Sequence, residues 1–541
     1  MHYTLLTSLL ALGFTTLAVA DPPLETGDFN ITKALLDHGV DVTEVPALSD
    51  DIKRSYDRCA AACASLKFLY GDGAVETKDE AAYDAFISSY WSTSQGDVRP
   101  YCIFKPSKPA QVSVVVLLSR LTQCPFAAKS GGHAAFAGAS GSDGGITVSL
   151  SNLKGISLSK DKKIASVEPG NVWGDVYKEL TKSDVSVIGG RLYNIGVGGL
   201  TTGGGISYFS NIYGWACDNV DSFEVVLANG KIVNASAKKH PDLYWALRGG
   251  GNNFGLVVSF NLKTIPLPKG QLWGGNRYYT EDKFPALVDT AVKIINDIPQ
   301  DPKAGFWLVW AYANATKIAL GTLYYSEPDA GNAPIFEDFN AISAISDTSG
   351  NRFIAEYAQE SQETSPDGLR ETYYSLTTKA DHGLLEFARD LFYETILTVA
   401  DIPAIIPTFV LQAITIPQLE KMKNSGGNAL GLDAKDGPFF IIHLAFMWGD
   451  KADDNVVHAW MSDFLETVAK EAKRRGLEND YVYMNYASQF QNVVASYGSE
   501  NKAKLKSISK KYDPKQVFQV LQPGYFKLDR APVPDSRYYS H

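Results

Sequence analysis

Glycine is concentrated in a few short stretches of this 541-residue chain, and the densest, residues 196–205 ("GVGGLTTGGG"), has six glycines in ten residues. Another stretch, "KSGGH", places His133 directly after two glycines. Glycine loses much backbone entropy on folding, so such clusters are expected where φ is positive or where a ligand approaches the main chain. Tight turns account for Pro169-Gly170 and Asn229-Gly230, but not for the densest cluster. Because exposed N–H groups bind anions such as a diphosphate, the clusters predict one large, partly anionic ligand.

Length, charge and missing motifs exclude several classes of protein. A chain of 541 residues is expected to contain two domains or intertwined subdomains. The net charge is -10 and no basic stripe is present, so nucleic acid is not an expected partner. The motifs HExxH, GxxxxGK[ST] and GxSxG are absent, as is a GxGxxG that opens a helix, which excludes zinc proteases, P-loop enzymes, α/β-hydrolases and the Rossmann fingerprint. No metal site is expected.

Several features indicate export. The first twenty residues, "MHYTLLTSLLALGFTTLAVA", are uncharged and apolar and end in Ala-Val-Ala, which predicts a signal peptide cleaved after Ala20 and no membrane attachment afterwards. Sequons at Asn30, Asn234 and Asn314 fit a secretory route. The chain has five scattered cysteines: Cys59, Cys63, Cys102, Cys124 and Cys217. In an oxidising compartment an odd number leaves at least one thiol unpaired or bonded to another molecule.

The first half of the chain reads as strands and helices joined by glycine-rich corners. We expect a helix from Ser107, strands in "CPFAAKS" and "ITVSL", and a hairpin in "GISLSKDKKIASVEPG". Asn171 is expected to cap the helix "VWGDVYKEL", and Asn229-Gly230 to turn a second hairpin. "HPDLYWALRGGGNNFGLVVSFNL" reads as helix, glycine turn and strand. From about Gln271 aromatic residues become frequent, which indicates a sheet with a bulky aromatic face suited to an apolar or sugar-sized ligand.

Four glycine-containing motifs resemble the FAD-binding domain of the vanillyl-alcohol oxidase and p-cresol methylhydroxylase (PCMH) superfamily. They are "KSGGH" (129–133), "GVGGLTTGGGIS" (196–207), "DNVDSFEVVLANGKIVNAS" (218–236) and "PDLYWALRGGGNNFGLV" (241–257). Near the C-terminus, "YVYMNY" (481–486) and "YDPKQVF" (512–518) are similar to the berberine bridge enzyme-like branch. The motifs follow the family's order over nearly the whole mature chain.

The resemblance implies an α+β fold. A two-subdomain PCMH-type FAD-binding domain is expected beside a substrate domain whose antiparallel sheet is covered by helices. We expect a signal peptide at 1–20, an N-terminal helical segment at 21–97, the FAD-binding domain at 98–270, the substrate-binding domain at 271–475, and a C-terminal segment at 476–541 that returns to the FAD domain. The resemblance also suggests a disulfide between Cys63 and Cys124.

The resemblance further implies that FAD is covalently bound to His133 through the flavin 8α-methyl group, since a neutral imidazole nitrogen is a competent nucleophile. Relatives with a second link have a cysteine where this chain has Leu192, so a single link is expected. Ile195 occupies the position where small residues accompany fast reaction with O2, which leaves O2 and another electron acceptor both open. The residues expected to hold FAD are Lys129, Ser130, Gly131, Gly132, His133, Gly196, Gly198, Gly199, Thr202, Gly203, Gly204, Asn253, Gly255 and Asn485.

The chemistry implied is hydride transfer from a substrate carbon to flavin N5, assisted by a base. Tyr486 is the first candidate for the base and Tyr483 the second; a phenol needs a nearby positive charge, hydrogen bond or metal to act so. His443 is a further acid or base candidate, and Gln412 is a candidate pocket residue. Core packing remains the alternative for both tyrosines and for His443.

The expected function is a secreted FAD-linked oxidoreductase that oxidises an alcohol, amine or C–H position of a small organic molecule, in secondary metabolite biosynthesis. O2 or another acceptor takes the electrons. One alternative is an oligosaccharide oxidase. Another, from a different class, is a flavin-containing cyclase or a non-catalytic flavin-binding protein.

Overall fold

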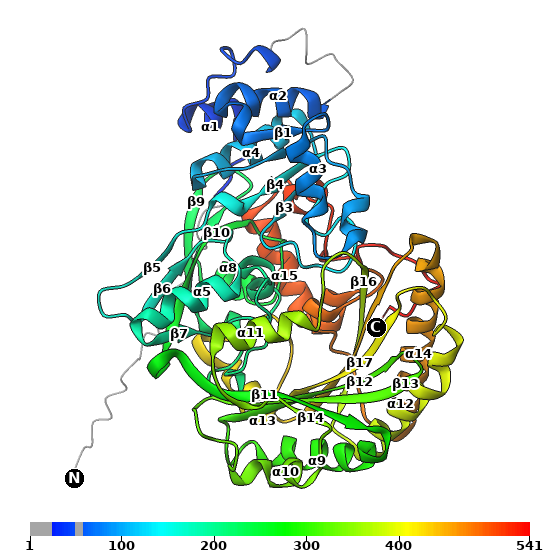
Figure 1. The fold of residues 1–541 in the computed structure, drawn as a ribbon. Helices are drawn as coiled ribbons and strands as arrows, with labels where there is room; N and C mark the ends of the chain where they lie inside the picture. Colours follow the sequence, from blue (N-terminus) through cyan, green and yellow to red (C-terminus); the bar gives the residue numbers. More distant parts are fainter. Residues whose placement is uncertain (1–23, 49–57, 541) are drawn as a thin grey trace, which may run out of the picture.

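The computed structural model describes residues 24–48 and 58–540 of the chain. The expected signal peptide, residues 1–20, lies outside the described residues. Three sheets organise the rest (Figure 1): a four-stranded sheet near the N-terminal helices, a six-stranded sheet beside it, and a nine-stranded sheet at the opposite end of the molecule.

The four-stranded sheet has the order β1-β2-β4-β3. Its strands are β1 (Val75–Thr77), β2 (Cys102–Phe104), β3 (Phe126–Lys129) and β4 (Ile146–Ser149), and its helices are α1 (Ile31–Asp37), α2 (Arg58–Tyr70), α3 (Ala81–Ser88) and α4 (Pro109–Thr122). Helix α4 starts with Pro109 in its first turn and ends at Gln123 in the left-handed region, which confirms the predicted helix. Both β2 and β3 run parallel to β4, as strands joined by crossover connections do.

Two disulfides tie α2 to this sheet: Cys59–Cys124 and Cys63–Cys102. The expected Cys63–Cys124 pair is therefore wrong. Cys59 and Cys63 are four residues apart on a helix and share one face, so both can face the sheet. Cys63 meets Cys102 at the start of β2, and Cys59 meets Cys124 in the loop before β3. Cys217 is free and buried, as the odd number of cysteines predicts.

The six-stranded sheet has the order β5-β6-β10-β8-β9, with β7 pairing with the end of β10. Its strands are β5 (Ile156–Leu158), β6 (Ile164–Val167), β7 (Val185–Val187), β8 (Val220–Val226), β9 (Ile232–Ser236) and β10 (Leu256–Pro266), with helices α5 (Trp173–Leu180), α6 (Val197–Thr202), α7 (Ser210–Tyr213) and α8 (Pro241–Leu247). The hairpins β5–β6 and β8–β9 confirm the sequence predictions, the second turning at Gly230 with φ of 78°.

The predicted cap of α5 is wrong. Val172 is the N-cap, and Asn171 lies one residue earlier. The Asn171 side-chain nitrogen donates instead to the carbonyl oxygens of Glu168 (3.0 Å) and Gly155 (3.4 Å). An asparagine can bond backbone groups on either side of a helix start, and here it fixes the preceding loop.

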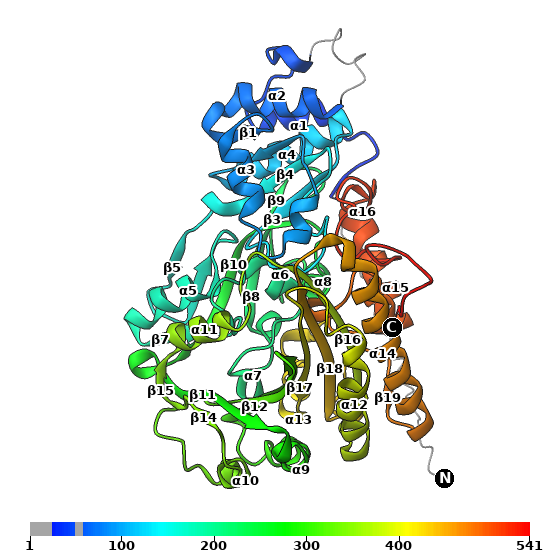
Figure 2. The same ribbon diagram turned by 45° about the vertical axis from the view of Figure 1, so that its right-hand side comes forward.

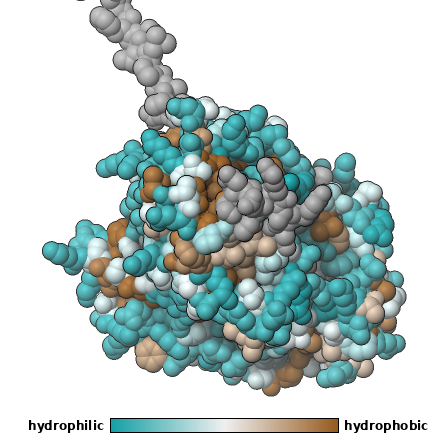
Figure 3. Space-filling model, turned by 90° about the horizontal axis from the view of Figure 1, so that it is seen from above, coloured by the Kyte–Doolittle hydropathy of each residue, from teal (hydrophilic) through white to brown (hydrophobic). Residues whose placement is uncertain are grey.

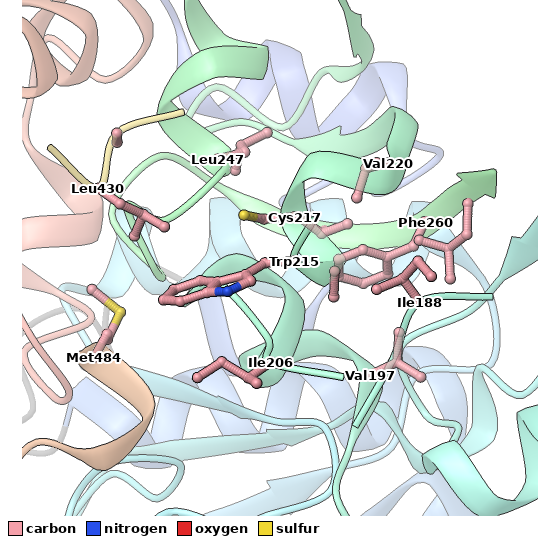
Figure 4. Packing of buried hydrophobic residues seen from close by; sticks show 14 of the residues in the cluster. Ile188, Val197, Ile206, Trp215, Cys217, Val220, Leu247, Phe260, Leu430 and Met484 are labelled. Carbon is pink, nitrogen blue, oxygen red and sulfur yellow. The ribbon is translucent and has the colours of Figure 1, made fainter. Parts of the chain in front are cut away.

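The core of this part includes Trp215 and Cys217, both fully buried (Figure 4). Around them pack Ile206 from the densest glycine cluster, Leu430 and, from the C-terminal segment, Met484. The glycine-rich loops therefore rest on a rigid apolar base made from distant parts of the sequence.

The nine-stranded sheet is antiparallel, with the order β14-β11-β13-β12-β17-β18-β16-β19 and with β15 pairing with β11. Its strands are β11 (Gln271–Thr280), β12 (Ala304–Ala313), β13 (Thr316–Tyr325), β14 (Ser346–Asp347), β15 (Gly350–Phe353), β16 (Arg370–Lys379), β17 (Ile406–Ile414), β18 (Phe439–Trp448) and β19 (Glu478–Asn479). Its helices are α9 (Phe284–Asp297), α10 (Glu337–Ala341), α11 (Ile354–Glu363), α12 (His382–Thr395), α13 (Ile416–Lys421) and α14 (Asp454–Arg475).

Alternation along each long strand gives this sheet two different faces. On β18, Phe440, Ile442 and Leu444 belong to the core shared with α9, α12 and α14, which cover the outer face (Figure 2). His443 and Ala445, between them, point to the inner face and line a cavity. The α+β architecture, with an antiparallel sheet covered by helices, is as the resemblance implies.

The C-terminal segment, with helices α15 (Ser499–Tyr512) and α16 (Val517–Val520), returns to the first part of the chain. Figure 1 shows α15 in orange-red beside α8 in green. Lys511 on α15 pairs with Asp242 on α8 at 2.7 Å, and the Gln519 side-chain nitrogen donates to Asn253 Oδ1 at 2.9 Å.

Across the described residues, no helix combines the length and apolar character that crossing a membrane requires. Seen from the end that carries α1 and α2, the surface is largely hydrophilic with a few hydrophobic groups (Figure 3).

Candidate active site

A cavity of about 540 Å³ lies between the glycine-rich loops and the inner face of the nine-stranded sheet. The loop after β3, the loop before α6 and α6 itself form one wall, the sheet forms the opposite wall, and the C-terminal motif "YMNY" closes a side. Its size and position between two parts of the fold are typical of a cofactor or substrate site.

The two glycine motifs meet backbone to backbone. A Cβ atom on Gly131 would lie 2.4 Å from the Gly196 nitrogen, and one on Gly196 would lie 2.2 Å from the Gly131 nitrogen. Ser130 Oγ donates to the Pro169 carbonyl oxygen at 2.5 Å and accepts from the Gly198 N–H at 3.1 Å, which fixes both loops. Only glycine permits this approach, which explains why both motifs carry glycine here despite the backbone entropy that it loses on folding.

The glycines also leave main chain open to the cavity. Gly199 lines the cavity, and a Cβ atom there would meet no atom of the described chain within 4 Å. Gly198, Thr202 and Gly255 line the cavity as well. Bare backbone beside an open space of this volume fits a large cofactor that contacts the main chain, so the residues present fit FAD.

His133 lies on the loop after β3 and lines the cavity. Its Nε2 is buried and, among the described residues, has no hydrogen-bond partner. Burial lowers the pKa of His133 to about 4, so the imidazole is neutral at physiological pH. Such a nitrogen is free to react with or bind a ligand in the cavity.

On the opposite side of the cavity, Arg191 joins two of the candidate residues. Its Nη2 donates to Tyr486 Oη at 2.5 Å, and its Nη1 donates to Gln412 Oε1 at 2.5 Å. The guanidinium is buried and lies 4.5 Å from the centre of the Trp307 ring. Arg191 therefore places a positive charge directly beside the Tyr486 phenol.

His443 stacks on the Tyr486 ring, with 4.1 Å between ring centroids and 5° between planes. Burial, together with the positive charge of Arg191, lowers the pKa of His443 to about 3. Its Nε2 is buried without a partner in the described part of the chain. His443 is thus a neutral imidazole in the cavity wall.

Tyr483 also lines the cavity, but its oxygen is engaged differently. Tyr483 Oη accepts hydrogen bonds from the Gly205 N–H (3.1 Å), the Ile206 N–H (3.2 Å) and Asn485 Nδ2 (3.0 Å). Burial raises the pKa of Tyr483 above its ordinary value. These contacts tie the C-terminal motif to the end of the glycine cluster.

The structure brings most of the candidate residues to this cavity. Its lining includes Ser130, Gly131, Gly132, His133, Gly196, Gly198, Gly199, Thr202, Gly255, His443, Tyr483, Asn485 and Tyr486. Four of the candidate FAD-binding residues lie outside the lining: Lys129, Gly203, Gly204 and Asn253. Gln412, the candidate pocket residue, also lies outside it and reaches the cavity only through Arg191.

These four residues lie against other parts of the protein. The Lys129 ammonium lies 4.7 Å from the centre of the Tyr90 ring, and burial lowers its pKa to about 8. Asn253 Nδ2 donates to the carbonyl oxygens of Gly250 and Phe526. A Cβ on Gly203 would lie 2.2 Å from Asn485 Oδ1, and Gly204 has φ of 129°.

Sequence reasoning missed Arg191, Trp307, Tyr373 and Trp91, all of which line the cavity. The only signal for Arg191 is a charge next to two glycines in "IGGRLYNIG". The alternation of β12 could have placed Trp307 on the face opposite Phe306 and Leu308.

Two protein families match this chain. The family described as "FAD binding domain" matches residues 100–236, and the family described as "Berberine and berberine like" matches residues 482–523. The chain is 34% identical over 500 residues to the FAD-dependent monooxygenase tpcD of Cochliobolus heterostrophus, covering 89% of this chain and 96% of that protein. It is 33% identical over 517 residues to the FAD-dependent monooxygenase drtC of Aspergillus calidoustus, covering 92% and 96%.

Solved structures share the fold at low sequence identity. A berberine bridge enzyme variant in complex with (S)-reticuline superposes with a TM-score of 0.71 at 17% identity, covering 89% of this chain and 99% of that one. The 6-hydroxy-D-nicotine oxidase of Arthrobacter nicotinovorans gives 0.71 at 19%, covering 84% and 97%. The xylooligosaccharide oxidase of Myceliophthora thermophila in complex with xylobiose gives 0.68 at 22%, covering 88% and 100%. Together with the cavity and its glycine loops, these matches establish that the chain is an FAD-dependent oxidoreductase and belongs to the berberine bridge enzyme-like family.

Proposed function

We propose that this oxidoreductase removes a hydride and a proton, two hydrogens in all, from an alcohol, amine or C–H position of a small, largely apolar organic molecule, with Tyr486 as the base that takes the proton. The observation that carries the proposal is the hydrogen bond from Arg191 to Tyr486 inside the cavity. When bound, FAD supplies the acceptor for the two electrons.

The protein's own residues handle the proton. Tyr486 Oη is the atom that takes the substrate proton, and the adjacent guanidinium of Arg191 holds this oxygen in place by donating a hydrogen bond to it. Gln412 keeps Arg191 in place by accepting from its other nitrogen. His443, neutral and stacked on Tyr486, offers Nε2 for a hydrogen bond to the substrate.

The inner face of the sheet favours an apolar substrate over an oligosaccharide. Much of it is aliphatic or aromatic: Tyr278, Trp307, Val309, Leu320, Val410, Ala445 and Met447 line the cavity. Two threonine hydroxyls on this face are already engaged, since Thr322 Oγ1 donates to Asn276 Oδ1 at 2.8 Å and Thr408 Oγ1 donates to the Ala445 carbonyl oxygen at 2.5 Å. A sugar would lose hydration of its hydroxyl groups here without gaining equivalent partners.

A flavin-reduction assay tests the base. The purified protein is mixed anaerobically with alcohols, amines and polyketide-like phenols, and the loss of flavin absorbance is followed. We expect Tyr486→Phe to bleach at least about a hundredfold more slowly than the unmodified protein, the range general-base catalysis covers. Tyr357→Phe is the matched control, because Tyr357 is fully buried, donates to the Leu323 carbonyl oxygen and lies outside the cavity lining.

Equal bleaching rates for Tyr486→Phe and the control would refute the proposed base. No bleaching of the unmodified protein by any compound would favour the cyclase or binding-protein alternative. Because several relatives are named monooxygenases, the product mass is also measured, to distinguish loss of two hydrogens from gain of an oxygen atom. Admitting air or a dye after bleaching identifies the electron acceptor. This comparison is needed because Ile195 lines the cavity at the position where small residues accompany fast reaction with O2.

We further propose that FAD is covalently bound, through His133 only. A neutral imidazole in the cavity wall supports the bond. Leu192 replaces a second cysteine link, and Cys217, the free cysteine of the described residues, is not part of the lining. His133 would be the residue that holds the flavin. The attachment would replace a C–H bond of the flavin methyl group and the imidazole N–H bond by a C–N bond, and O2 would take up the two protons and two electrons released, giving hydrogen peroxide.

Acid precipitation tests the covalent bond. The unmodified protein is expected to give a yellow pellet, and His133→Ala a colourless one with free flavin in the supernatant. A yellow pellet from His133→Ala would place the bond elsewhere. A colourless pellet from the unmodified protein would show that FAD is held without a covalent bond.

We also propose that the chain passes through the secretory pathway. Two disulfides and three exposed sequon asparagines, Asn30, Asn234 and Asn314, support this. The protein is expected in the medium, losing mass on treatment with an endoglycosidase; unglycosylated protein retained in cells would contradict it.

A further inference from the structure

A short segment that precedes the matched FAD-binding region packs against the loop that carries His133. This segment, residues 90–95, includes the first three residues of the short 3-10 helix Thr93–Asp97. It lies outside the family match, which begins at residue 100. Two of its side chains, Gln95 and Trp91, touch the loop on both sides of the imidazole.

Gln95 fixes the backbone around His133. Its Nε2 donates to the carbonyl oxygens of Gly132 (2.8 Å) and Ala134 (2.6 Å), the residues immediately before and after His133. Its Oε1 accepts from Ser140 Oγ at 2.6 Å, and the side chain is 1% exposed. Both N–H donors of this buried amide are used and its oxygen accepts a third hydrogen bond, so the two peptide groups flanking His133 have little freedom to rotate.

Trp91 fixes the side chain. Its ring stacks on the His133 imidazole with 4.1 Å between centroids and 14° between planes. The indole is itself anchored, because Trp91 Nε1 donates to the Ser365 carbonyl oxygen at 3.3 Å. One face of the imidazole is therefore covered by a rigid aromatic surface while its edge meets the cavity.

We propose that Gln95 and Trp91 are positioning residues for attachment of the flavin to His133. This inference rests on the proposed covalent bond. Gln95 sets the backbone from which the imidazole projects, and Trp91 sets the plane of the ring, so the reacting nitrogen is held on one line of approach. Formation of a bond is sensitive to such placement, and a displacement of about 1 Å can slow a reaction by roughly a hundredfold.

The test compares covalent with total flavin in Gln95→Met and Trp91→Leu. Methionine keeps the length of the side chain without its hydrogen bonds, and leucine removes the stacked ring. Full-length protein is collected soon after induction, so that slow attachment is not hidden by long incubation. We expect both variants to bind FAD but to show an acid-stable fraction about tenfold lower than the unmodified protein. Trp91→Phe, which keeps an aromatic ring, is expected to retain most of it.

Gln491→Met and Trp460→Leu are the matched controls. Gln491 is fully buried and its Nε2 donates to the Ser375 carbonyl oxygen at 2.8 Å. Trp460 donates from Nε1 to the Thr395 carbonyl oxygen at 3.0 Å and stacks on Phe464 at 13°. They remove comparable buried contacts away from His133, so thermal unfolding and total flavin measured alongside separate misfolding from misplacement.

The outcomes are distinct. A normal acid-stable fraction in Gln95→Met and Trp91→Leu overturns the positioning role but leaves the covalent bond standing. An equal loss of the acid-stable fraction in the controls overturns it too. So does a fall in total flavin while the acid-stable fraction of the remaining flavin stays normal. Absence of acid-stable flavin from the unmodified protein overturns the bond and the positioning role together.

Discussion

Glu371 is a carboxyl group in a place where no charge is accommodated. It is 1% exposed, and neither of its oxygens has a hydrogen-bond partner among the described residues. Burial, reinforced by the nearby negative charge of Asp367, raises the pKa of Glu371 to about 10. His133 and His443 are kept neutral by burial in the same way. Glu371, His133 and His443 thus share a dry setting that disfavours their ionisation.

We predict that Glu371→Gln stabilises the protein at neutral pH. In the unfolded chain this carboxyl ionises above about pH 4.5, whereas in the folded protein it stays protonated up to about pH 10. Folding is therefore unpenalised below pH 4.5 and increasingly penalised as the pH rises towards 10. At pH 7 the penalty is about 3 kcal/mol, at about 1.4 kcal/mol for each intervening pH unit. Glutamine removes it while keeping the shape.

Denaturant unfolding of the two proteins at pH 4, 7 and 9 checks this. The gain in free energy of unfolding should be near zero at pH 4 and grow with pH. A gain that is constant over the range would show that the carboxyl group is not the cause.

At the scale of elements, the fold brings two glycine loops into contact through their main chains and leaves part of the same motif bare. Gly131 and Gly196 make the contact between the two loops, whereas Gly199, on α6, has open space beside it. One motif therefore contains glycines needed for folding and a glycine that is not.

We predict opposite effects for two alanine substitutions in these loops. Gly131→Ala should lower the free energy of unfolding by about 1–3 kcal/mol, since its Cβ would overlap the Gly196 nitrogen. Gly199→Ala should leave stability unchanged or slightly higher, because alanine favours helix, yet weaken FAD binding by filling cavity space. Chemical denaturation and FAD titration of protein carrying His133→Ala measure the two effects separately. Equal stability losses would contradict the assignment.

Elements with strong local signals could be predicted from the sequence, and contacts between distant segments could not. Asn229-Gly230 marked its hairpin, and Pro109 the start of its helix. Placing His443 on a strand was correct, but the sequence alone did not show that it stacks on Tyr486. Arg191 and Tyr486 are 295 residues apart, the first in a loop and the second at the end of a three-residue 3-10 helix, so their hydrogen bond depends on tertiary packing alone. The disulfide prediction failed for a related reason. Cys59 and Cys63 are four residues apart on one helix, and the sequence alone did not show which of them pairs with Cys124.

At the scale of the whole molecule, two nested cross-links fasten the N-terminal helices to the flavin-binding part. Cys59–Cys124 spans 65 residues and Cys63–Cys102 spans 39. The segment between them includes Trp91 and Gln95. The cross-links thus limit the unfolded freedom of the region that contacts the His133 loop.

We predict that removing either cross-link lowers the free energy of unfolding by about 3–4 kcal/mol, slightly more for the wider loop, because the unfolded chain gains entropy. The double variants are Cys59→Ala with Cys124→Ala, and Cys63→Ala with Cys102→Ala. Thermal unfolding measures the loss, and non-reducing peptide mapping checks the pairing. A peptide linking Cys63 to Cys124 would contradict the structure.

The C-terminal segment has a consequence for how the protein is made. Tyr483, Asn485 and Tyr486 form a wall of the cavity, and Gln519 bonds to Asn253 beyond it. These residues are synthesised long after the glycine loops at 129–133 and 196–205 that they complete. The enclosed chamber is thus finished only once the ribosome has passed residue 486, and a polypeptide cut short before residue 483 lacks one of its walls.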